Sequence, residues 1–318
     1  MTSTRGLHTR WQAKNTPMWP RFYDGQYWSR AFFIQRQTAI AIWQGLMLAF
    51  LCAVWQRHSS FLMASFISCP ETLHQTGMRA ILSLSMWLLF ARLIGDFNYR
   101  IVSIISTALK TSDFQDWPPL FNSMLEAWTL RRFWGTFWHQ CLRWPFCSAA
   151  TVITRKGLGL QRPSLLERYT HILCVFVISG TLHTLCDLAF GIRWHESGAL
   201  LFFSSFALGI MVEDGVQAVW RRITTAGTRS GNGLENKRKR KMHGGEVTPT
   251  WQKEVGFAWV TLWFTITTPS YLGKNWQALI ADIDDVDLPF ISDLYSWTLV
   301  LSLLVGAGFL RWRFGANV

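Results

Sequence analysis

The chain has 318 residues, of which 50% are hydrophobic, only 16% are charged and 19 are tryptophan. A water-soluble protein of this length needs more charge to cover its surface, so this composition excludes a pair of ordinary soluble domains and favours a polytopic membrane protein. The net charge of +12 is concentrated in a few segments, which indicates membrane topology rather than binding to nucleic acid. The six cysteines form no CxxC pair, which argues against a zinc site or a disulfide framework.

Six apolar segments approach the length of about 20 residues that a bilayer-spanning helix requires. They lie at 38–55, 81–95, 169–190, 199–220, 255–272 and 294–310, and the second continues into the apolar run 101–109. The segment 111–160 is too polar to span a membrane and too aromatic for a free loop. After its Pro118–Pro119 pair we expect an amphipathic interfacial helix, because apolar residues at 121, 125, 128 and 130 recur at helical spacing, and then a re-entrant piece.

Lysine and arginine set the orientation of these spans, because cytosolic loops are enriched in both. Residues 221–247 hold eight of them among Gly, Ser and Thr, so we expect a mobile basic cytosolic loop over 221–250. Both termini are expected in the cytosol, and the aspartate-rich segment 273–293 in the lumen. The expected fold is all-α: one membrane domain over 1–318, a polytopic helical bundle of about six transmembrane helices with additional interfacial or re-entrant helices.

His183 is an ionisable residue in the lumenal half of the segment 169–190, and such a residue inside a span suggests function. Ser179 and Gly180, one turn earlier, are small, so another molecule could approach the imidazole closely. Asp187 is one turn later on the same face and could hold the second imidazole nitrogen. A histidine that hydrogen-bonds a neighbouring helix for packing explains this segment equally well.

His139 follows the aromatic stretch FWGTFW and precedes Gln140 and Arg143. Taken alone, this segment is better explained as an interfacial tryptophan cluster, with Trp134 and Trp138 around Gly135, than as a catalytic element.

Several stretches, in this order, resemble the wax-synthase-like branch of the membrane-bound O-acyltransferases. LRRFWGTFWHQ is similar to the FWG-x-x-W-(Asn/His) signature of that branch, and VISGTLH is similar to its SG-x-x-H helix. FALGIMVED and VGFAWVTLWFTITTP resemble the helices that follow, and TRGLHTRWQAKN resembles the RG-x-x-x-x-WQ-x-KN segment of fungal members. The resemblance covers nearly the whole chain. Family members have more hydrophobic helices before the RG segment, which starts here at residue 5, so we expect a compact member or one that lacks its first helices.

The resemblance implies transfer of an acyl group from coenzyme A to a hydroxyl, with acyl-CoA as cosubstrate and no permanently bound cofactor or metal. His183 matches the catalytic histidine of the family, and His139 matches its partner polar position, which is Asn in many relatives. The fungal pattern favours acetyl-CoA as the donor, a terpenoid-type secondary metabolite as the acceptor and the endoplasmic reticulum as the location. The supporting residues are Asp187, Trp134, Gly135, Trp138, Ser179 and Gly180.

The chemistry of the two histidines suits this reaction. A neutral imidazole, with a pKa of about 6.5, can take the proton of a hydroxyl as it attacks a thioester. His139 can polarise the thioester carbonyl or stabilise its oxyanion, and we expect it to face the same chamber as His183. Besides the small molecules, membrane lipid is the expected partner. Two alternatives remain open: a wax ester synthase that joins a fatty acyl group to a long-chain alcohol, and a transporter that uses His183 and Asp187 as a proton relay.

Overall fold

The structure is a computed structural model that describes residues 5–7, 9, 12–17, 29–67, 72–189, 191–228 and 248–284. Within these ranges the chain forms helices and turns without any β-strand, in agreement with the predicted all-α class. The longer helices are α1 (Arg30–Ile67), α2 (Leu73–Ser85), α3 (Arg92–Ala108), α5 (Arg143–Thr151), α6 (Leu165–Ala189), α7 (Ala199–Thr228) and α9 (Thr250–Asp284). Short helical turns between them are η2 (Met86–Ala91), η3 (Phe114–Asp116), η4 (Met124–Glu126), α4 (Leu130–Arg132), η5 (Phe133–Phe137) and η6 (Val152–Gly157).

Three helices in the described part of the chain are long and apolar enough to cross a membrane, namely Arg30–Val54, Leu165–Ala189 and Ala199–Thr224. They contain or closely match the predicted spans 38–55, 169–190 and 199–220. The predicted spans 81–95 and 255–272 are helical, but neither lies in a helix that is long and apolar enough by the same measure. The sixth predicted span, 294–310, lies outside the described residues.

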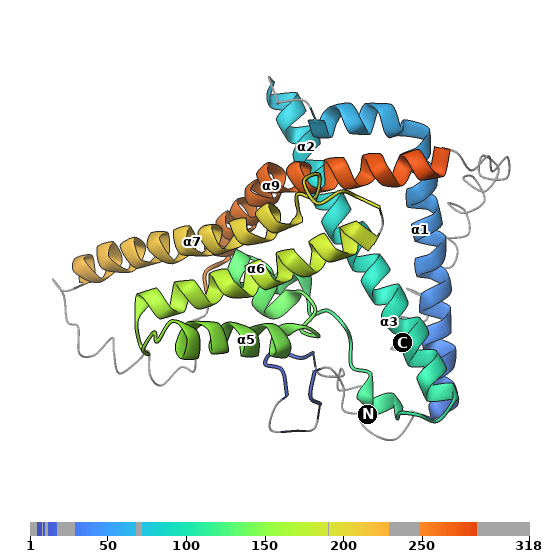
Figure 1. Ribbon diagram of the computed structural model, residues 1–318, viewed down its shortest axis with the longest axis horizontal. Coiled ribbons are helices and arrows are strands. Elements are labelled where there is room, and N and C mark those ends of the chain that lie inside the picture. Colours follow the sequence, from blue (N-terminus) through green and yellow to red (C-terminus); the bar gives the residue numbers. More distant parts are fainter. Residues whose placement is uncertain are drawn as a thin grey trace.

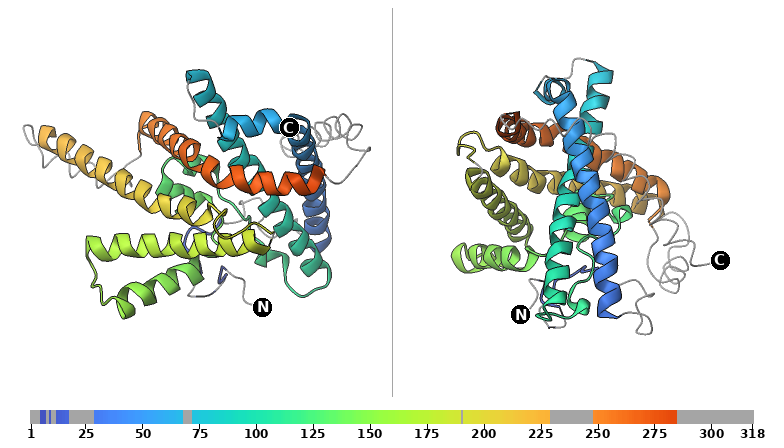
Figure 2. Two further views of the ribbon diagram at one scale, coloured as in Figure 1. Left: turned by 45° about the horizontal axis from the view of Figure 1, so that its top comes forward. Right: turned by 90° about the vertical axis from the view of Figure 1, so that its right-hand side faces the viewer.

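The long helices form two groups that are steeply inclined to each other (Figure 1). In one group α6 and α7 run antiparallel and in contact, with α5 packed against α6; in the other, α1 packs against α3. Helix α9 crosses between the groups and contacts α1, α2 and α7 (Figure 2). The buried core lies where α6, α7 and α9 meet the segment 120–138, and it is mostly aromatic; its largest members are Phe121, Phe133, Phe137, Trp138, Phe176, Phe202, Phe203, Phe206, Phe264 and Tyr271.

A polar network joins α1 to α3. Asp96 of α3 accepts hydrogen bonds from Arg100 Nη2 at 2.7 Å and from Gln44 Nε2 of α1 at 2.7 Å. Arg100 also donates to the side-chain oxygen of Gln37 of α1. Gln37 and Gln44 are only 3% and 4% exposed. Because an unpaired polar group is costly in apolar surroundings, these contacts fix the position of α1 against α3.

The prediction of a continuous interfacial helix after Pro118 and Pro119 is wrong, because the chain forms several short elements there. Residues 124–137 instead fold as a 3₁₀ turn, one turn of α-helix and a π-helical turn. The side chains of Ser123 and Thr129 accept backbone hydrogen bonds and start a new short element each time.

The basic loop predicted over 221–250 begins later than expected. Helix α7 continues to Thr228, and α9 starts at Thr250. Residues 229–247, which contain most of the loop charge, lie outside the described residues, so their mobility and cytosolic position stay predictions.

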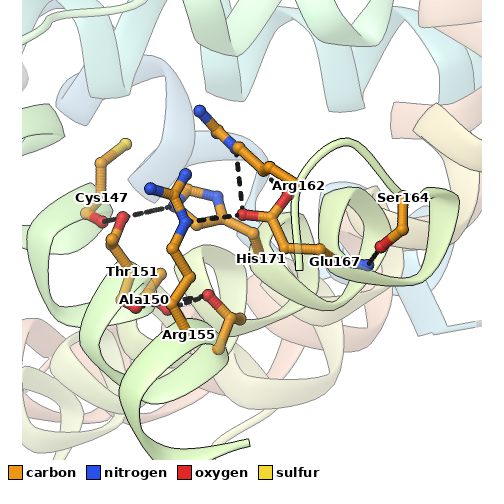
Figure 3. A network of polar contacts seen from close by, with 9 residues as sticks. Cys147, Ala150, Thr151, Arg155, Arg162, Ser164, Glu167 and His171 are labelled. Carbon is orange, nitrogen blue, oxygen red and sulfur yellow. Dashed lines mark hydrogen bonds and ion pairs between the residues drawn. The ribbon is translucent and has the colours of Figure 1, made fainter. Parts of the chain in front are cut away.

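Helices α5 and η6 are fastened to α6 by polar contacts (Figure 3). Glu167 of α6 has a side chain only 3% exposed, and it accepts from Arg155 Nε at 3.0 Å and from Arg162 Nε at 3.1 Å. One turn after Glu167 on α6, His171 Nε2 lies 3.2 Å from Thr151 Oγ1. These contacts hold the chain that follows the aromatic segment against the helix that carries His183.

Helices α6 and α7 approach each other closely at Gly180. A Cβ atom at this position would lie 2.8 Å from Cα of Leu200 and 3.3 Å from the carbonyl oxygen of Ala199. The small residue therefore admits the backbone of α7. This corrects the expectation that Gly180 leaves space for a second molecule beside His183.

Gly180→Ala should therefore weaken the packing of α6 on α7, since overpacking of this kind costs about 1–3 kcal/mol. Gly215→Ala is the matched control on α7, because a Cβ there would meet nothing within 4 Å. Replacing a helical glycine by alanine without a clash is stabilising by up to about 1 kcal/mol. Thermal unfolding in detergent checks the pair, and equal Tm values for the two variants would contradict the close approach.

Candidate active site

His183 is held on two sides in α6. Its Nδ1 lies 2.8 Å from the backbone oxygen of Ser179, one turn earlier. A carbonyl only accepts, so Nδ1 carries the proton, and the lone pair of the neutral ring is on Nε2. The ring also packs against Phe203 of α7, with ring centroids 4.1 Å apart and planes inclined by 31°. His183 is thus a fixed imidazole with a defined proton-accepting nitrogen.

No hydrogen bond joins Asp187 to His183 in the described part of the chain. Its Oδ2 accepts from Ser197 Oγ at 2.6 Å, and Ser197 Oγ accepts in turn from the backbone N–H of Ala199 at 3.3 Å. The carboxylate, only 6% exposed, therefore fastens the connection between α6 and α7. The backbone oxygen of Ser179 accepts the hydrogen bond from His183 Nδ1 instead, so the described residues do not show the direct His183–Asp187 contact that a proton relay in a transporter needs.

His139 follows the π-helical turn η5, which ends at Phe137. The backbone N–H of Trp138 donates to the oxygen of Phe133 at 2.7 Å and closes this turn. The imidazole lies against Phe121 and Trp138, with ring centroids 6.0 and 5.6 Å away. Its Nδ1 is buried and has no hydrogen-bond partner among the described residues. Because a buried orphan acceptor is better tolerated than a buried orphan N–H, the arrangement favours the tautomer with its proton on Nε2.

Two side chains just after His139 pair the carbonyls of the turn before it. Gln140, which is 2% exposed, donates from Nε2 to the oxygens of Trp134 at 3.1 Å and Trp138 at 2.5 Å. Arg143 Nη1 donates to the oxygen of Gly135 at 2.7 Å and to Gln140 Oε1 at 2.7 Å. These bonds replace the partners that the carbonyls at the end of a helix lack.

Two asparagines complete the set from the other side. Asn122 donates from Nδ2 to the oxygen of Thr136 at 2.8 Å and from its backbone N to the oxygen of Phe137 at 3.1 Å. Asn15, far away in the sequence, donates from Nδ2 to the oxygen of Gly135 at 2.7 Å. Every carbonyl from 134 to 138 therefore accepts from a group outside the turn.

Helix α7 holds the opposite end of the same segment. Glu213, which is 7% exposed, accepts from the backbone N–H groups of Leu130 and, at 3.2 Å, of Arg131. Asp214 accepts from Arg131 Nη2 at 2.6 Å and from Arg168 Nη2 of α6 at 2.8 Å. The segment is therefore anchored to α7 at its beginning and closed by its own polar side chains at its end.

Aromatic rings connect the two histidines. Phe203, which packs on His183, is 5.8 Å from Trp134, and Trp134 is 5.8 Å from Trp138, the neighbour of His139 (centroid to centroid). The structure thus brings the two predicted histidines into one aromatic region. In the described ranges, no group of three or more His, Cys, Asp and Glu side chains is placed to hold a metal ion.

Sequence reasoning missed the polar residues that build this region. Gln140 and Arg143 were noted beside His139 without a role, and Asn15, Asn122 and Glu213 were not noted as site residues. The available signal was chemical: amide and carboxylate groups among so many aromatic residues must be hydrogen-bonded, which marks them as structural partners of nearby backbone.

Comparisons with known proteins show the family. Residues 117–205 match the model of the family described as "Membrane bound O-acyl transferase family". The chain is 37% identical over 327 residues to "Acetyltransferase atnC" of Arthrinium sp, covering 100% of this chain and 71% of that protein. The chain belongs to the membrane bound O-acyl transferase family. It is also 36% identical over 315 residues to "Acetyltransferase spyB" of Aspergillus fumigatus, covering 97% of this chain. No solved structure matches it.

This member of the membrane bound O-acyl transferase family spans 52% of the length of the Aspergillus relative and 71% of the Arthrinium relative. The matched region runs from Trp117 to Ser205. It therefore contains both histidines and Phe203, together with the whole of α5 and α6.

The pKa of His139 gives a test of its burial. Burial first, and then the charges of His183 and Arg5, lower this pKa from 6.5 to about 4. Between these two values the unfolded state binds more protons than the folded state, so stability falls as the pH falls through this window and is fully present above about pH 6.5. We expect the Tm of the wild type in detergent to fall further between about pH 7 and about pH 5 than that of His139→Asn. Equal declines would contradict the burial of this imidazole.

Proposed function

We propose that this chain transfers the acetyl group of acetyl-CoA to a hydroxyl of a terpenoid-type secondary metabolite, with His183 as the general base. The observation that carries the proposal is the hydrogen bond from Nδ1 to Ser179, since it leaves Nε2 as the proton acceptor. The two relatives are named acetyltransferases and come from fungi, which supports an acetyl donor over the fatty acyl donor of a wax ester synthase.

In the proposed reaction Nε2 of His183 removes the hydroxyl proton as the acceptor oxygen attacks the carbonyl carbon of the thioester. The new C–O bond forms, the C–S bond breaks, and the proton on His183 passes to the sulfur of coenzyme A. Neither a covalent acyl-enzyme nor a further co-reactant is needed.

His139 supplies the complementary group in this proposal. A neutral His139 donates from Nε2 to the thioester oxygen, where negative charge develops in the transition state. Burial keeps this ring neutral, because its pKa of about 4 lies far below neutral pH. The Asn that many members of the wax-synthase-like branch carry at this position donates from its amide in the same way.

Loss of the general base should abolish acyl transfer without unfolding the protein. His183→Ala should lower the rate by at least about 10²–10⁴-fold, the usual contribution of general-base catalysis. The matched control is His171→Ala, which removes an imidazole from the same helix about three turns earlier, where it contacts Thr151. Microsomes are given acetyl-CoA, or palmitoyl-CoA in parallel, with an extract of candidate alcohols, and esters are measured by mass spectrometry per folded protein.

A well-folded His183→Ala protein that keeps near-wild-type turnover would overturn the mechanism. His139→Ala should also lose activity in this assay, whereas His139→Asn should keep part of it. Palmitoyl esters without acetyl esters would favour the wax ester synthase.

The same proposal has the chain cross the endoplasmic reticulum membrane six times, with both termini and the loop 221–250 in the cytosol. Three spans are supported by the long apolar helices α1, α6 and α7, and the others by the charge pattern. Protease added to sealed microsomes should cut within KRKRK, residues 237–241. Protection of this sequence until detergent is added would contradict the topology.

A further inference from the structure

Two described residues near the start of the chain, Arg5 and Asn15, contact opposite ends of the segment that carries His139. That segment is irregular from Trp117 to Ser123 and ends in the η5 turn, so much of its backbone lacks helical partners. In apolar surroundings each unpaired carbonyl is costly, so the groups that pair it determine where the segment lies.

Arg5 pairs the carbonyls at the beginning of the segment. Its guanidinium donates to the oxygen of Pro118 at 2.9 Å and to that of Pro119 at 2.8 Å. It also donates to the hydroxyl of Tyr99, which itself donates to Pro118 at 2.8 Å, and it lies 5.2 Å from the centre of the Tyr99 ring. Arg5 is 2% exposed. A planar fork of donors serves two successive carbonyls in a way that the single ammonium of lysine cannot.

Asn15 pairs the end of the segment. Its Nδ2 donates to the oxygen of Gly135 at 2.7 Å, and its own backbone oxygen accepts from Asn122 Nδ2 at 2.7 Å. Its φ of 61° lies in the left-handed region, which asparagine tolerates better than most residues. The backbone bond from Ala13 N to Arg5 O, at 2.8 Å, closes the loop that joins the two contacts.

We propose that Arg5 and Asn15 are positioning residues for acyl transfer, because together they clamp Pro118, Pro119 and Gly135 and so keep His139 within reach of His183. This inference rests on the proposed function of the two histidines. Neither residue needs to touch a substrate: both act on the backbone that leads to His139.

Two substitutions test the positioning role of Arg5 and Asn15 while changing the rest of the fold as little as possible. Asn15→Gly keeps the left-handed backbone and its carbonyl but removes the donor to Gly135. Arg5→Lys keeps the charge but not the fork. Lys14→Ala, an exposed neighbour in the same loop, is the control. Since displacement of a reacting group by about 1 Å can cost about 100-fold in rate, we expect kcat to fall about 10- to 100-fold in both variants, with KM for acetyl-CoA nearly unchanged, and no change in the control.

A second measurement does not depend on activity. In a variant without native cysteines, Cys residues introduced at positions 139 and 183 should react with a short bifunctional thiol reagent, and adding Asn15→Gly or Arg5→Lys should lower the cross-linking yield by at least half. Lower cross-linking in a protein without acetyl transfer would leave the clamp standing and reject the proposed function. If folded Asn15→Gly protein keeps the wild-type kcat and the wild-type cross-linking yield, the clamp is overturned. A rise in KM without a fall in kcat would also overturn it, because it would indicate that the residue contacts the substrate. If Arg5→Lys does not fold, the result for the exposed Asn15 decides.

Discussion

The backbone of residues 118–138 has to find hydrogen-bond partners outside a regular helix, and much of the polar chemistry around the site meets that need. The carbonyls of the η5 turn accept from Gln140, Arg143, Asn122 and Asn15. At the other end, the carboxylate of Glu213 accepts the first N–H groups of the short helix α4. In aqueous surroundings water would serve these groups, but among aromatic side chains only protein partners remain. The irregular path of the segment is therefore specified by polar residues from distant parts of the chain.

The packing of α6 on α7 then supplies the second half of the site. Because Gly180 lets the two backbones approach, the ring of Phe203 packs against His183 and also contacts Trp134 of the aromatic segment. The two imidazoles differ in a useful way: one has its N–H tied to a carbonyl, and the other has its Nδ1 enclosed without a partner. In the proposed reaction the same side-chain type therefore takes opposite roles, with a lone pair on Nε2 of His183 and an N–H on Nε2 of His139.

The sequence predicted what depends on short stretches of chain and failed where distant residues decide. A long apolar run is conspicuous, and so is an ionisable residue deep within one, so α6, α7 and the position of His183 were foreseeable. The continuous helix expected after Pro118 does not form. Its apolar spacing could not show that Glu213, on a helix much later in the chain, accepts hydrogen bonds from the backbone N–H groups of Leu130 and Arg131. The sequence pairs Asp187 with His183, one turn away on the same face of the helix, but the connection to α7 brings Ser197 within hydrogen-bonding distance of its carboxylate.

The polar network between α1 and α3 bears on how the bundle assembles. Gln37 and Gln44 are two helical turns apart and share one face of α1, where each contacts the Asp96–Arg100 ion pair of α3. A slip of α1 by a single turn, about 5.4 Å, would move both amides away and leave that ion pair without them in apolar surroundings. Apolar helices can pair in many registers of similar energy, and the hydrogen bonds of these two amides favour one register over the others. Since α9 contacts α1, α2 and α7, an error in the pairing of α1 with α3 would displace α7 and, through it, α6, the helix that carries His183.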